Sequence, residues 1–401
     1  MTNRSNPGPL SGLKVLDLSR FVAGPFCAMM LGDLGADVVK IEKRDGGDEV
    51  RKAPPLVGGE SLFVMVFNRN KRSLTLDLKH PDGPKILKEL VAEADILIEN
   101  FRPGVMEKFG CGWDELKAVN DRLIMARISG YGQDGPHARR PSFDAIAQAG
   151  SGMMEMTGSS DGPPTLAGTT VIDHTTGLHA TVGILSALHA RETTGRGQLV
   201  DVALLDSALS LLMTAIPAYA LLGIKQERMG NRDRYGAPSN TFPTSDGHFV
   251  HIVAGGDDRF ARFAVAVGLE HLLDDPKYET NETRLEHADE LETMVIAWTT
   301  SQTCDEIIAA MEEARVPCGK VADIAEVIDN PQLRHRGQII DVDHPTAGTV
   351  PMQGFVTKLS DTPADVRRPA PGPGEHNAEI LADWLGYDTV RVRGLEDSRI
   401  I

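Results

Sequence analysis

The sequence has few cysteines and lacks the short motifs that mark several common protein classes. Its four cysteines are scattered, and no two of them have a CxxC spacing. Neither a zinc site nor a disulfide framework is therefore predicted, and we expect a reducing, cytoplasmic location. There is no HExxH motif, no EF-hand loop and no P-loop, so a metal-dependent protease, a calcium sensor and a P-loop nucleotidase are not indicated.

Long apolar runs are also missing. No run reaches the roughly 18 residues that a membrane-spanning helix needs, so we expect no membrane partner. The first residues, MTNRSNPGPLSG, contain no apolar core of a signal peptide, and they predict a short flexible lead.

Basic residues are too few to balance the acidic ones. The 401 residues include 41 Lys and Arg and 57 Asp and Glu, which gives a net charge of -16. We therefore expect no nucleic-acid partner. An anionic ligand would have to meet basic residues that gather locally. Such a cluster exists, and it is either a site for a nucleotide phosphate or a solvated face with interleaved acidic residues. Its members are Lys40, Lys43, Arg44, Arg51, Lys52, Arg69, Lys71, Arg72, Arg102 and Lys108.

The order of the elements predicts an α/β protein with a parallel, doubly wound sheet. Strands are expected at residues 13–18, 36–42, 73–78, 96–99, 123–128 and 200–204, and helices at 26–35, 81–94, around 178–188 and at 206–222. Residues 225–247 are polar, rich in Gly and Pro, and without periodicity, which is typical of a linker at a domain boundary. A strand and several helices between residues 248 and 324 suffice for a small second domain.

The stretch GTTVIDHTTG, residues 168–177, places a carboxylate between two apolar segments. Residues 169–172 resemble the end of a strand, and a helix follows. Asp173 is then either the N-cap of that helix or a nucleophile in a dry, positive pocket. His174 either orients Asp173 or only caps the helix, and the structural role is favoured.

Two further motifs limit the chemistry. The first strand-to-helix turn, LSRFVAGPFC, lacks GxGxxG, so a dinucleotide fingerprint is absent. Its Gly-Pro start still offers free backbone N–H groups to an anion, although it can equally be an ordinary turn. A formal GxSxG at residues 158–162 is followed by Pro163-Pro164, which forbids the helix of a serine hydrolase.

Taken in order, several motifs resemble one enzyme family. They are LDLSRFVAGPFCAMMLGDLGADVVKIE, NRNKRSLTLDLK, DILIENFRPG, ISGYGQDGP, FDAIAQAGSGMM, the segment from TGSSDGPP to LLDSAL, and VPCGKVADIAEVIDNPQLRHRG. Together they resemble the class III CoA-transferases, the family of formyl-CoA and carnitine CoA-transferases, which also contains α-methylacyl-CoA racemases. The resemblance runs from about residue 10 to the C-terminal helix.

The resemblance implies an architecture. A Rossmann-like large domain would be built from both chain ends, residues 1–224 and 331–401. Residues 225–330 would form the linker and a small α+β domain. Two copies would form an interlocked homodimer.

The resemblance also implies a function, the transfer of CoA from an acyl-CoA donor to a small carboxylic acid. Asp173 would be the nucleophile and would form an aspartyl anhydride and an aspartyl-CoA thioester. CoA and acyl-CoA would be substrates, and no cofactor or metal would be bound permanently. The residues that match CoA-contacting positions of the family are Arg20, Phe21, Val22, Ala23, Lys43, Lys71, Asn100, Phe101 and Lys108.

Departures from the family pattern leave alternatives open. Phe143 stands where racemases have a histidine, which argues against a racemase without removing it, and a CoA-binding protein without turnover also stays open. Ile172 replaces a glycine, Val22 departs from the small or polar set that is usual in the turn, and no glycine-rich active-site loop is found, which weakens oxalate or formate as a substrate. A second carboxylate could be bound by an arginine, and the candidates are Arg20, Arg232 and Arg234. Whether His174 or Asp144 assists catalysis is not determined.

Overall fold

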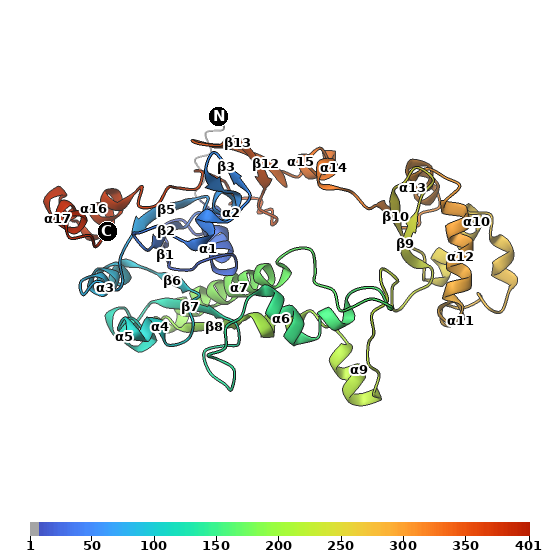
Figure 1. Ribbon diagram of the computed structural model, residues 1–401, viewed down its shortest axis with the longest axis horizontal. Helices are drawn as coiled ribbons and strands as arrows, with labels where there is room; N and C mark the ends of the chain where they lie inside the picture. The colour runs from blue at the N-terminus through green and yellow to red at the C-terminus, as the bar shows by residue number, and fades with distance from the viewer. Residues whose placement is uncertain (1–7) are drawn as a thin grey trace. The chain divides into compact units, whose positions relative to one another are not determined.

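The structure, a computed structural model, describes residues 8–401. Its largest sheet has six strands (Figure 1). All neighbouring strands are parallel, in the order β5-β2-β1-β6-β7-β8. The bounds are β1 (Lys14–Asp17), β2 (Asp37–Glu42), β5 (Lys71–Thr75), β6 (Ile96–Glu99), β7 (Ile124–Ser129) and β8 (Leu199–Ala203). The parallel α/β sheet is confirmed. Its strands follow the doubly wound order 3-2-1-4-5-6, and the direction of winding reverses between β1 and β6.

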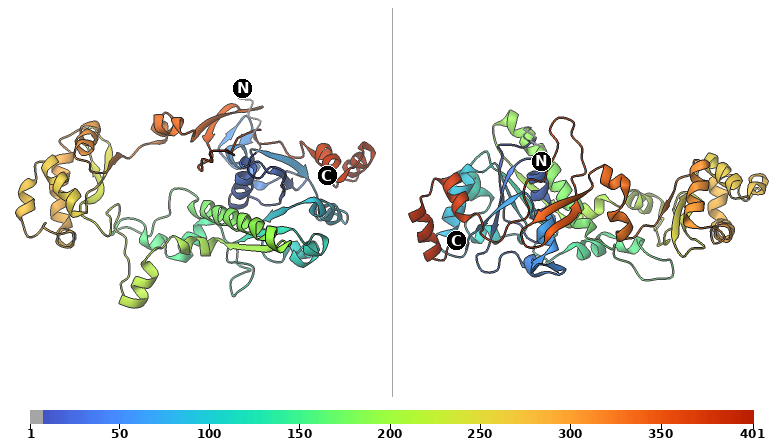
Figure 2. Two further views of the ribbon diagram at one scale, coloured as in Figure 1. Left: turned by 180° about the vertical axis from the view of Figure 1, so that it is seen from behind. Right: turned by 90° about the horizontal axis from the view of Figure 1, so that it is seen from above.

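Side chains of the strands alternate between two apolar cores. Val15 and Ile96 face one core together with α1 (Ala23–Asp33) and α7 (Val171–Thr194). Leu16 and Leu97 face the other, with α3 (Gly83–Glu93), α5 (Trp113–Val119) and α16 (Asn377–Leu385). The sheet is apolar on both faces because helices cover both of them. Figure 2 shows α7 as the long helix that runs along the sheet.

The C-terminal segment returns to the same unit. The helices α16 and α17 (Thr389–Asp397) lie near α3 and β5 (Figure 1). The N–H of Asp77 donates to the carbonyl oxygen of Ile400 over 2.8 Å. The hairpin of β12 (Ile339–His344) and β13 (Gly348–Gln353) packs on α2 (Leu62–Phe67). The C-terminal segment therefore packs with distant N-terminal residues in two separate apolar clusters.

Contacts divide the chain into two compact units. The first contains residues 8–153, 166–216 and 331–401 of the described chain, and the second contains residues 154–165 and 217–330. The second unit has an antiparallel sheet in the order β11-β10-β9, formed by β9 (Ser239–Pro243), β10 (Phe249–Val253) and β11 (Cys318–Lys320). Its core packs against this sheet with α10 (Asp257–Ala266), α12 (Ala288–Thr299) and α13 (Cys304–Glu313).

The remaining elements are short. The antiparallel pair β3 (Leu56–Val57) and β4 (Glu60–Ser61) precedes α2. The short helices are η1 (Glu49–Lys52), α4 (Val105–Lys108), α6 (Asp144–Ser151), η2 (Met154–Met156), η3 (Glu270–Asp274), α11 (Asn281–Glu286), α14 (Ile324–Ile328) and α15 (Pro331–His335).

Three details of the sequence prediction are wrong. The apolar helix expected at 206–222 is two helices, α8 (Leu204–Ser210) and α9 (Ala215–Leu222), because Pro217 fits only the first turn of a helix. The linker expected at 225–247 contains strand β9, whose pairing with β10 gives order to a segment without periodicity. Residues 169–172 are not the end of a strand, since α7 begins at Val171.

Two kinds of feature are not found in the part of the chain that the structure describes. Between residues 8 and 401, no single helix is both long and apolar enough to cross a membrane; only the broken pair α8 and α9 has sufficient length and composition when taken together. Within the same range, no group of three or more His, Cys, Asp or Glu side chains is arranged to hold a metal ion.

Candidate functional site

The turn after β1 is fixed by side chains from two other segments. The N–H of Arg20 donates to Oδ1 of Asn100 over 2.8 Å, and Nδ2 of Asn100 donates to the carbonyl oxygen of Arg20 over 2.7 Å. Phe21 has a left-handed backbone, φ 65°, which is unusual for a bulky residue. Its N–H donates to Oδ2 of Asp48 over 3.2 Å. Strain of this kind persists where surrounding contacts enforce it, and it is frequent at binding sites.

The end of β6 is fixed in a similar way. Oε2 of buried Glu99 accepts a hydrogen bond from the N–H of Phe101 over 2.7 Å, and Oε1 accepts one from Arg127 over 2.6 Å. Burial raises the pKa of Glu99 to about 7, although the charge and hydrogen bond of Arg127 lower it. The loop that holds Asn100 and Phe101 is thereby anchored to the sheet.

The start of α7 is capped by a carboxylate from another helix. Oδ2 of Asp144 accepts hydrogen bonds from the backbone N–H groups of Ile172, over 2.7 Å, and Asp173, over 3.0 Å. Gln148 donates to Oδ1 of Asp144 over 2.5 Å and accepts from the N–H of Ala167 over 3.0 Å. Asp173 itself lies in the first turn of α7, whose N-cap is Thr170. The N-cap interpretation of Asp173 is therefore wrong, because Asp144 satisfies the orphan N–H groups instead.

The carboxylate of Asp173 is left without a partner of its own. Across residues 8–401, no side chain or backbone group donates a hydrogen bond to it, and it is only partly exposed. Burial, and after it the charge of Asp144, raise the pKa of Asp173 from 3.8 to about 7. A carboxyl group in this state exchanges its proton near neutral pH, which is common at functional sites.

Asp173 lines a cavity of about 330 Å³ at the switch point of the sheet. The loops after β1, β6 and β7 and the start of α8 after β8 all contribute to its wall. In open α/β sheets this is the place where ligands bind. The lining residues are Arg20, Phe21, Val22, Ala23, Glu49, Asn100, Phe101, Arg102, Pro103, Ile128, Ser129, Gly130, Ala138, Arg140, Pro141, Ser142, Phe143, Asp173 and Leu204. Six of the nine residues that the resemblance predicts to contact CoA therefore line the same cavity as Asp173.

A second cavity of about 340 Å³ adjoins the first. Both are lined by Arg20, Glu49 and Phe101, and the second also includes Lys43 and Lys79. Lys43 is paired with Glu49 at 2.8 Å. Lys108 is exposed on α4 and lines neither cavity, although Val105 and Phe109 beside it line the second.

Lys71 is buried and lines neither of the two cavities. Its ammonium is fully buried and donates to Asp17 over 2.7 Å, to Asn68 over 2.9 Å and to the carbonyl oxygen of Pro25 over 3.0 Å. Burial lowers its pKa to about 8 despite the contact with Asp17. Lys71 thus ties β5 to β1 and to α1 beneath the turn, and the structure gives it an internal role.

The basic cluster consists mainly of internal ion pairs. Lys40 lies 3.7 Å from Asp17, Arg69 pairs with Asp33 at 2.7 Å, and Arg51 pairs with Glu42 at 2.6 Å. Neither of the two sequence interpretations describes this arrangement well. A single sequence cannot separate such pairs from a phosphate site, because the acidic partners come from other strands and loops.

His174 is held by a backbone carbonyl and two aromatic rings. Its Nδ1 lies 2.8 Å from the carbonyl oxygen of Thr170, and its ring packs against Phe26 and Phe67 with centroids 4.9 and 5.8 Å away.

Three arginines were suggested to bind a second carboxylate. Of these, Arg20 lines the cavity of Asp173. Arg232 lies in the second unit and is occupied by Glu292 and Asp289 at 2.7 and 2.6 Å; Arg234, also in that unit, donates to the carbonyl oxygen of Glu227 over 2.5 Å.

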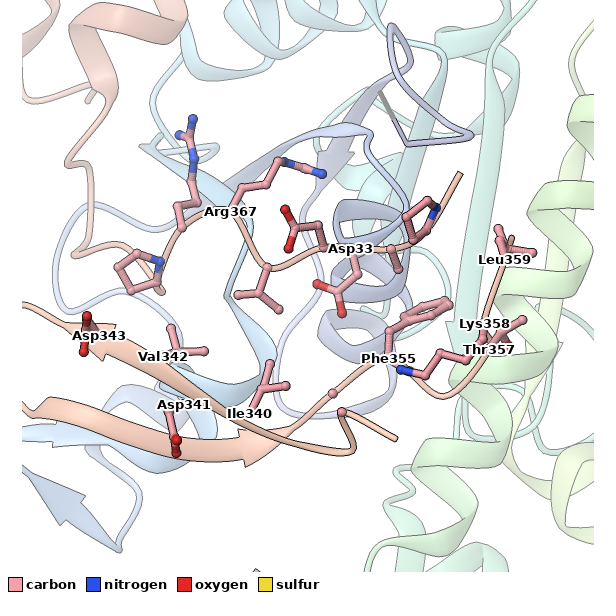
Figure 3. Close-up of a pocket in the computed structure, with 18 residues that line it drawn as sticks. Asp33, Ile340, Asp341, Val342, Asp343, Phe355, Thr357, Lys358, Leu359 and Arg367 are labelled. Atoms are coloured by element: carbon pink, nitrogen blue, oxygen red, sulfur yellow. The ribbon is translucent and has the colours of Figure 1, made fainter. Parts of the chain in front are cut away.

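A larger cavity of about 580 Å³ lies elsewhere in the first unit (Figure 3). It is formed by β12, the segment around Arg367 and Asp33 of α1. Figure 3 shows Ile340 pointing into it and the carboxylate of Asp341 pointing away. None of the predicted CoA residues lines this cavity, so its size alone does not identify the site.

Several site residues were not predicted from the sequence. Glu49, Ser129, Arg140 and Leu204 line the cavity of Asp173. Ser129 and Leu204 stand at or just after the ends of predicted strands, so the rule for the carboxyl ends of parallel strands could have found them. Glu49 begins the short helix η1 and Arg140 belongs to a loop, and neither position carries such a signal in the sequence.

Comparison with known proteins identifies the family. The model of CoA-transferase family III matches residues 10–377. The chain belongs to this family. Among its relatives, the succinyl-CoA–D-citramalate CoA-transferase of Chloroflexus aurantiacus is 40% identical over 402 residues, 100% of both chains. The human succinyl-CoA:glutarate CoA-transferase is 36% identical over 389 residues, 96% of this chain and 88% of that protein. The protein is thus a CoA-transferase, as the sequence resemblance indicated.

Solved structures agree with the family assignment. A CaiB/BaiF family protein from Brucella suis has a TM-score of 0.85 and 35% identity, and the match covers 94% of this chain and 100% of that one. The mixed α/β fold is therefore that of a family III CoA-transferase. Some relatives are named as α or β subunits of a succinyl-CoA–L-malate CoA-transferase.

Proposed function

We propose that this CoA-transferase moves CoA from a short dicarboxylyl-CoA, such as succinyl-CoA, to a second short dicarboxylic acid, with Asp173 as the nucleophile. The observation that carries the proposal is the placement of Asp173, whose carboxylate has no hydrogen-bond donor of its own in the described chain and lines the switch-point cavity. The acids come from the relatives, whose names state succinyl-CoA as one substrate and citramalate, malate or glutarate as the other.

The first half of the reaction consumes the donor. The carboxylate of Asp173 attacks the thioester carbonyl carbon, the carbon–sulfur bond breaks, and CoA leaves as a thiolate. The product is a mixed anhydride between Asp173 and the donor acid. The thiolate then attacks the aspartyl carbonyl carbon, which gives an aspartyl-CoA thioester and releases the donor acid as its carboxylate.

The second half repeats these steps in reverse with the acceptor. Its carboxylate attacks the aspartyl thioester, the thiolate leaves, and the thiolate then attacks the acceptor carbonyl of the new anhydride. Acceptor-CoA leaves and the carboxylate of Asp173 is restored. Acyl bonds of similar energy are exchanged in each step. Water must be kept out, since it would hydrolyse the anhydride.

We propose that CoA occupies both adjoining cavities. We place the nucleotide end in the cavity with Lys43 and Lys79, with Lys108 on the exposed flank, and the thioester end beside Asp173. The pantetheine arm then passes Arg20 and Phe101, which line both cavities. Asn100 would hold the turn of Arg20 to Ala23 in the shape that the arm requires.

We also propose that two copies of the chain associate, as the family resemblance implies. Apolar side chains of α9 and the residues around it are exposed, among them Met213, Tyr219, Leu221 and Leu222. Exposed apolar patches of this kind often mark an interface. Native mass spectrometry of the purified protein tests this: a dimer that persists under dilution supports an interlocked pair, and a monomer contradicts it.

The test of the reaction is a trapping experiment. The protein is mixed with succinyl-CoA without acceptor, treated with hydroxylamine or borohydride, and digested for peptide mass spectrometry. We expect a modified Asp173 in the wild type and none in Asp173→Asn. Asp134→Asn is the control, because it removes an exposed carboxylate outside the cavity. Asp173 of this variant should be modified as in the wild type. No adduct together with deuterium uptake next to the thioester would instead indicate a racemase.

A further inference from the structure

Three arginines line the cavity of Asp173, and only one of them already has an acidic partner within the protein. Arg20 lies 3.3 Å from Glu49 and stacks on the ring of Phe101 at 5.0 Å. For Arg102 and Arg140, no acceptor lies within hydrogen-bonding distance of the guanidinium anywhere in residues 8–401, and both residues are exposed. The cavity therefore holds two cationic groups without an anionic partner.

The two unpaired arginines come from different loops of the cavity wall, after β6 and after β7. Arg102 directly follows Phe101, which is shared with the cavity that contains Lys43. It therefore lies next to the proposed path of CoA. Arg140 belongs to the segment 138–143, of which all residues except Arg139 line the cavity of Asp173 and none lines the cavity of Lys43. The segment leads into Asp144, the residue that caps α7.

The segment around Arg140 is held in place by two contacts of the residues that follow it. Gly130 at the end of β7 packs so closely on Ser142 that an added Cβ would lie 2.3 Å from the Cβ of Ser142. Phe143 packs edge-on against Phe21 with centroids 5.4 Å apart. These contacts fix the position of the Arg140 backbone relative to the turn after β1 and to the start of α7.

A dicarboxylic acid brings one carboxylate that reacts and one that does not. The second carboxylate stays ionised near neutral pH, and placing it in a cavity without a partner is costly. A guanidinium offers a planar pair of N–H groups that match a carboxylate. In the proposed reaction the donor acid leaves before the acceptor enters, so one arginine can serve both acids in turn.

We infer that Arg140 binds the non-reacting carboxylate of both acids and thereby selects dicarboxylic over monocarboxylic substrates. This inference rests on the proposed function, because it assigns the substrate acids to the cavity of Asp173. Arg140 is a specificity-determining residue in this assignment and takes no part in bond exchange.

The experiment compares two donors that differ in one carboxylate, succinyl-CoA and butyryl-CoA. The single-turnover rate of Asp173 modification is measured with each donor in the wild type, Arg140→Ala, Arg140→Lys and Arg139→Ala. Arg139 is the matched control, since it is adjacent, exposed and outside the cavity. Loss of a charged hydrogen-bond partner should lower the succinyl-CoA specificity constant about 10- to 100-fold in Arg140→Ala. The butyryl-CoA constant should stay within about twofold, as expected when only a charged contact is removed.

The other variants complete the test. Arg139→Ala should keep the wild-type ratio between the donors, and Arg140→Lys should lie between wild type and Arg140→Ala because it keeps the charge but not the planar fork. Equal behaviour of Arg140→Ala and Arg139→Ala, or equal losses with both donors, would overturn the inference while leaving the proposed function intact. A wild type that is not modified at Asp173 by either donor would overturn the proposed function itself.

Discussion

The raised pKa of Asp173 gives a quantitative pH dependence for the first chemical step. The nucleophile is the carboxylate, and burial with the charge of Asp144 raises its pKa to about 7. The carboxylate fraction is then about 9% at pH 6 and about 91% at pH 8. The acylation rate should therefore rise about tenfold over this interval. With an ordinary pKa of 3.8 the rise would be only about 1%.

The assay is the single-turnover modification of Asp173 by succinyl-CoA, quenched at short times between pH 5 and 9 and quantified by peptide mass spectrometry. We expect one ionisation with its midpoint near pH 7. A rate that is flat between pH 6 and 8 would refute the reasoning, because it would mean that Asp173 is already fully ionised.

The cause of the shift can be tested with Asp144→Asn. This variant removes the second cause of the raised pKa, so the midpoint should move to lower pH, yet stay above 3.8 because burial is the larger cause. The side-chain amide of this variant has only one acceptor oxygen. Its NH2 group would therefore face another donor, either the side-chain NH2 of Gln148 or the backbone N–H groups at the start of α7. A stability loss of about 1–2 kcal/mol is expected from this mismatch. Asp134→Asn should leave the midpoint unchanged.

Three further predictions concern the framework of the site. Asn100→Ala removes two hydrogen bonds to the turn after β1; we expect the dissociation constant of CoA to rise about tenfold, measured by calorimetry, and unchanged binding would contradict the anchoring role. Lys71→Met leaves Asp17 without its closest cation. Denaturant titration should show that the free energy of unfolding falls by about 3–5 kcal/mol. Unchanged stability together with weaker CoA binding would instead mean that Lys71 contacts CoA. Gly177→Ala places a Cβ 2.8 Å from a backbone oxygen of α1 and should cost about 1–3 kcal/mol in thermal unfolding, while Gly394→Ala, with nothing within 4 Å, should be neutral or stabilising.

The sequence by itself determined the sheet and the place of the site. Strand-like segments separated by helical ones predicted all six parallel strands. A strand that helices cover on both faces is mostly apolar, whereas the strand at residues 73–78 was indicated by its alternation, and β5 lies at Lys71–Thr75 on the edge of the sheet. The order of the strands also identifies the loops at their carboxyl ends, where an open α/β sheet binds its ligands. The order of the motifs indicated the family, and Asp173 was selected with it.

Only the tertiary structure decided what the polar side chains do. Asp173 and Lys71 are both charged residues beside apolar segments, yet one lines a cavity without a partner and the other is buried among three acceptors. Asp144 caps a helix that begins 27 residues later in the chain, at Val171. Arg140 lines the cavity from a loop and Glu49 from the short helix η1. Local sequence encodes backbone preference and apolar periodicity, whereas the partner of a buried charge is set by which distant segments the packing of the sheet brings together.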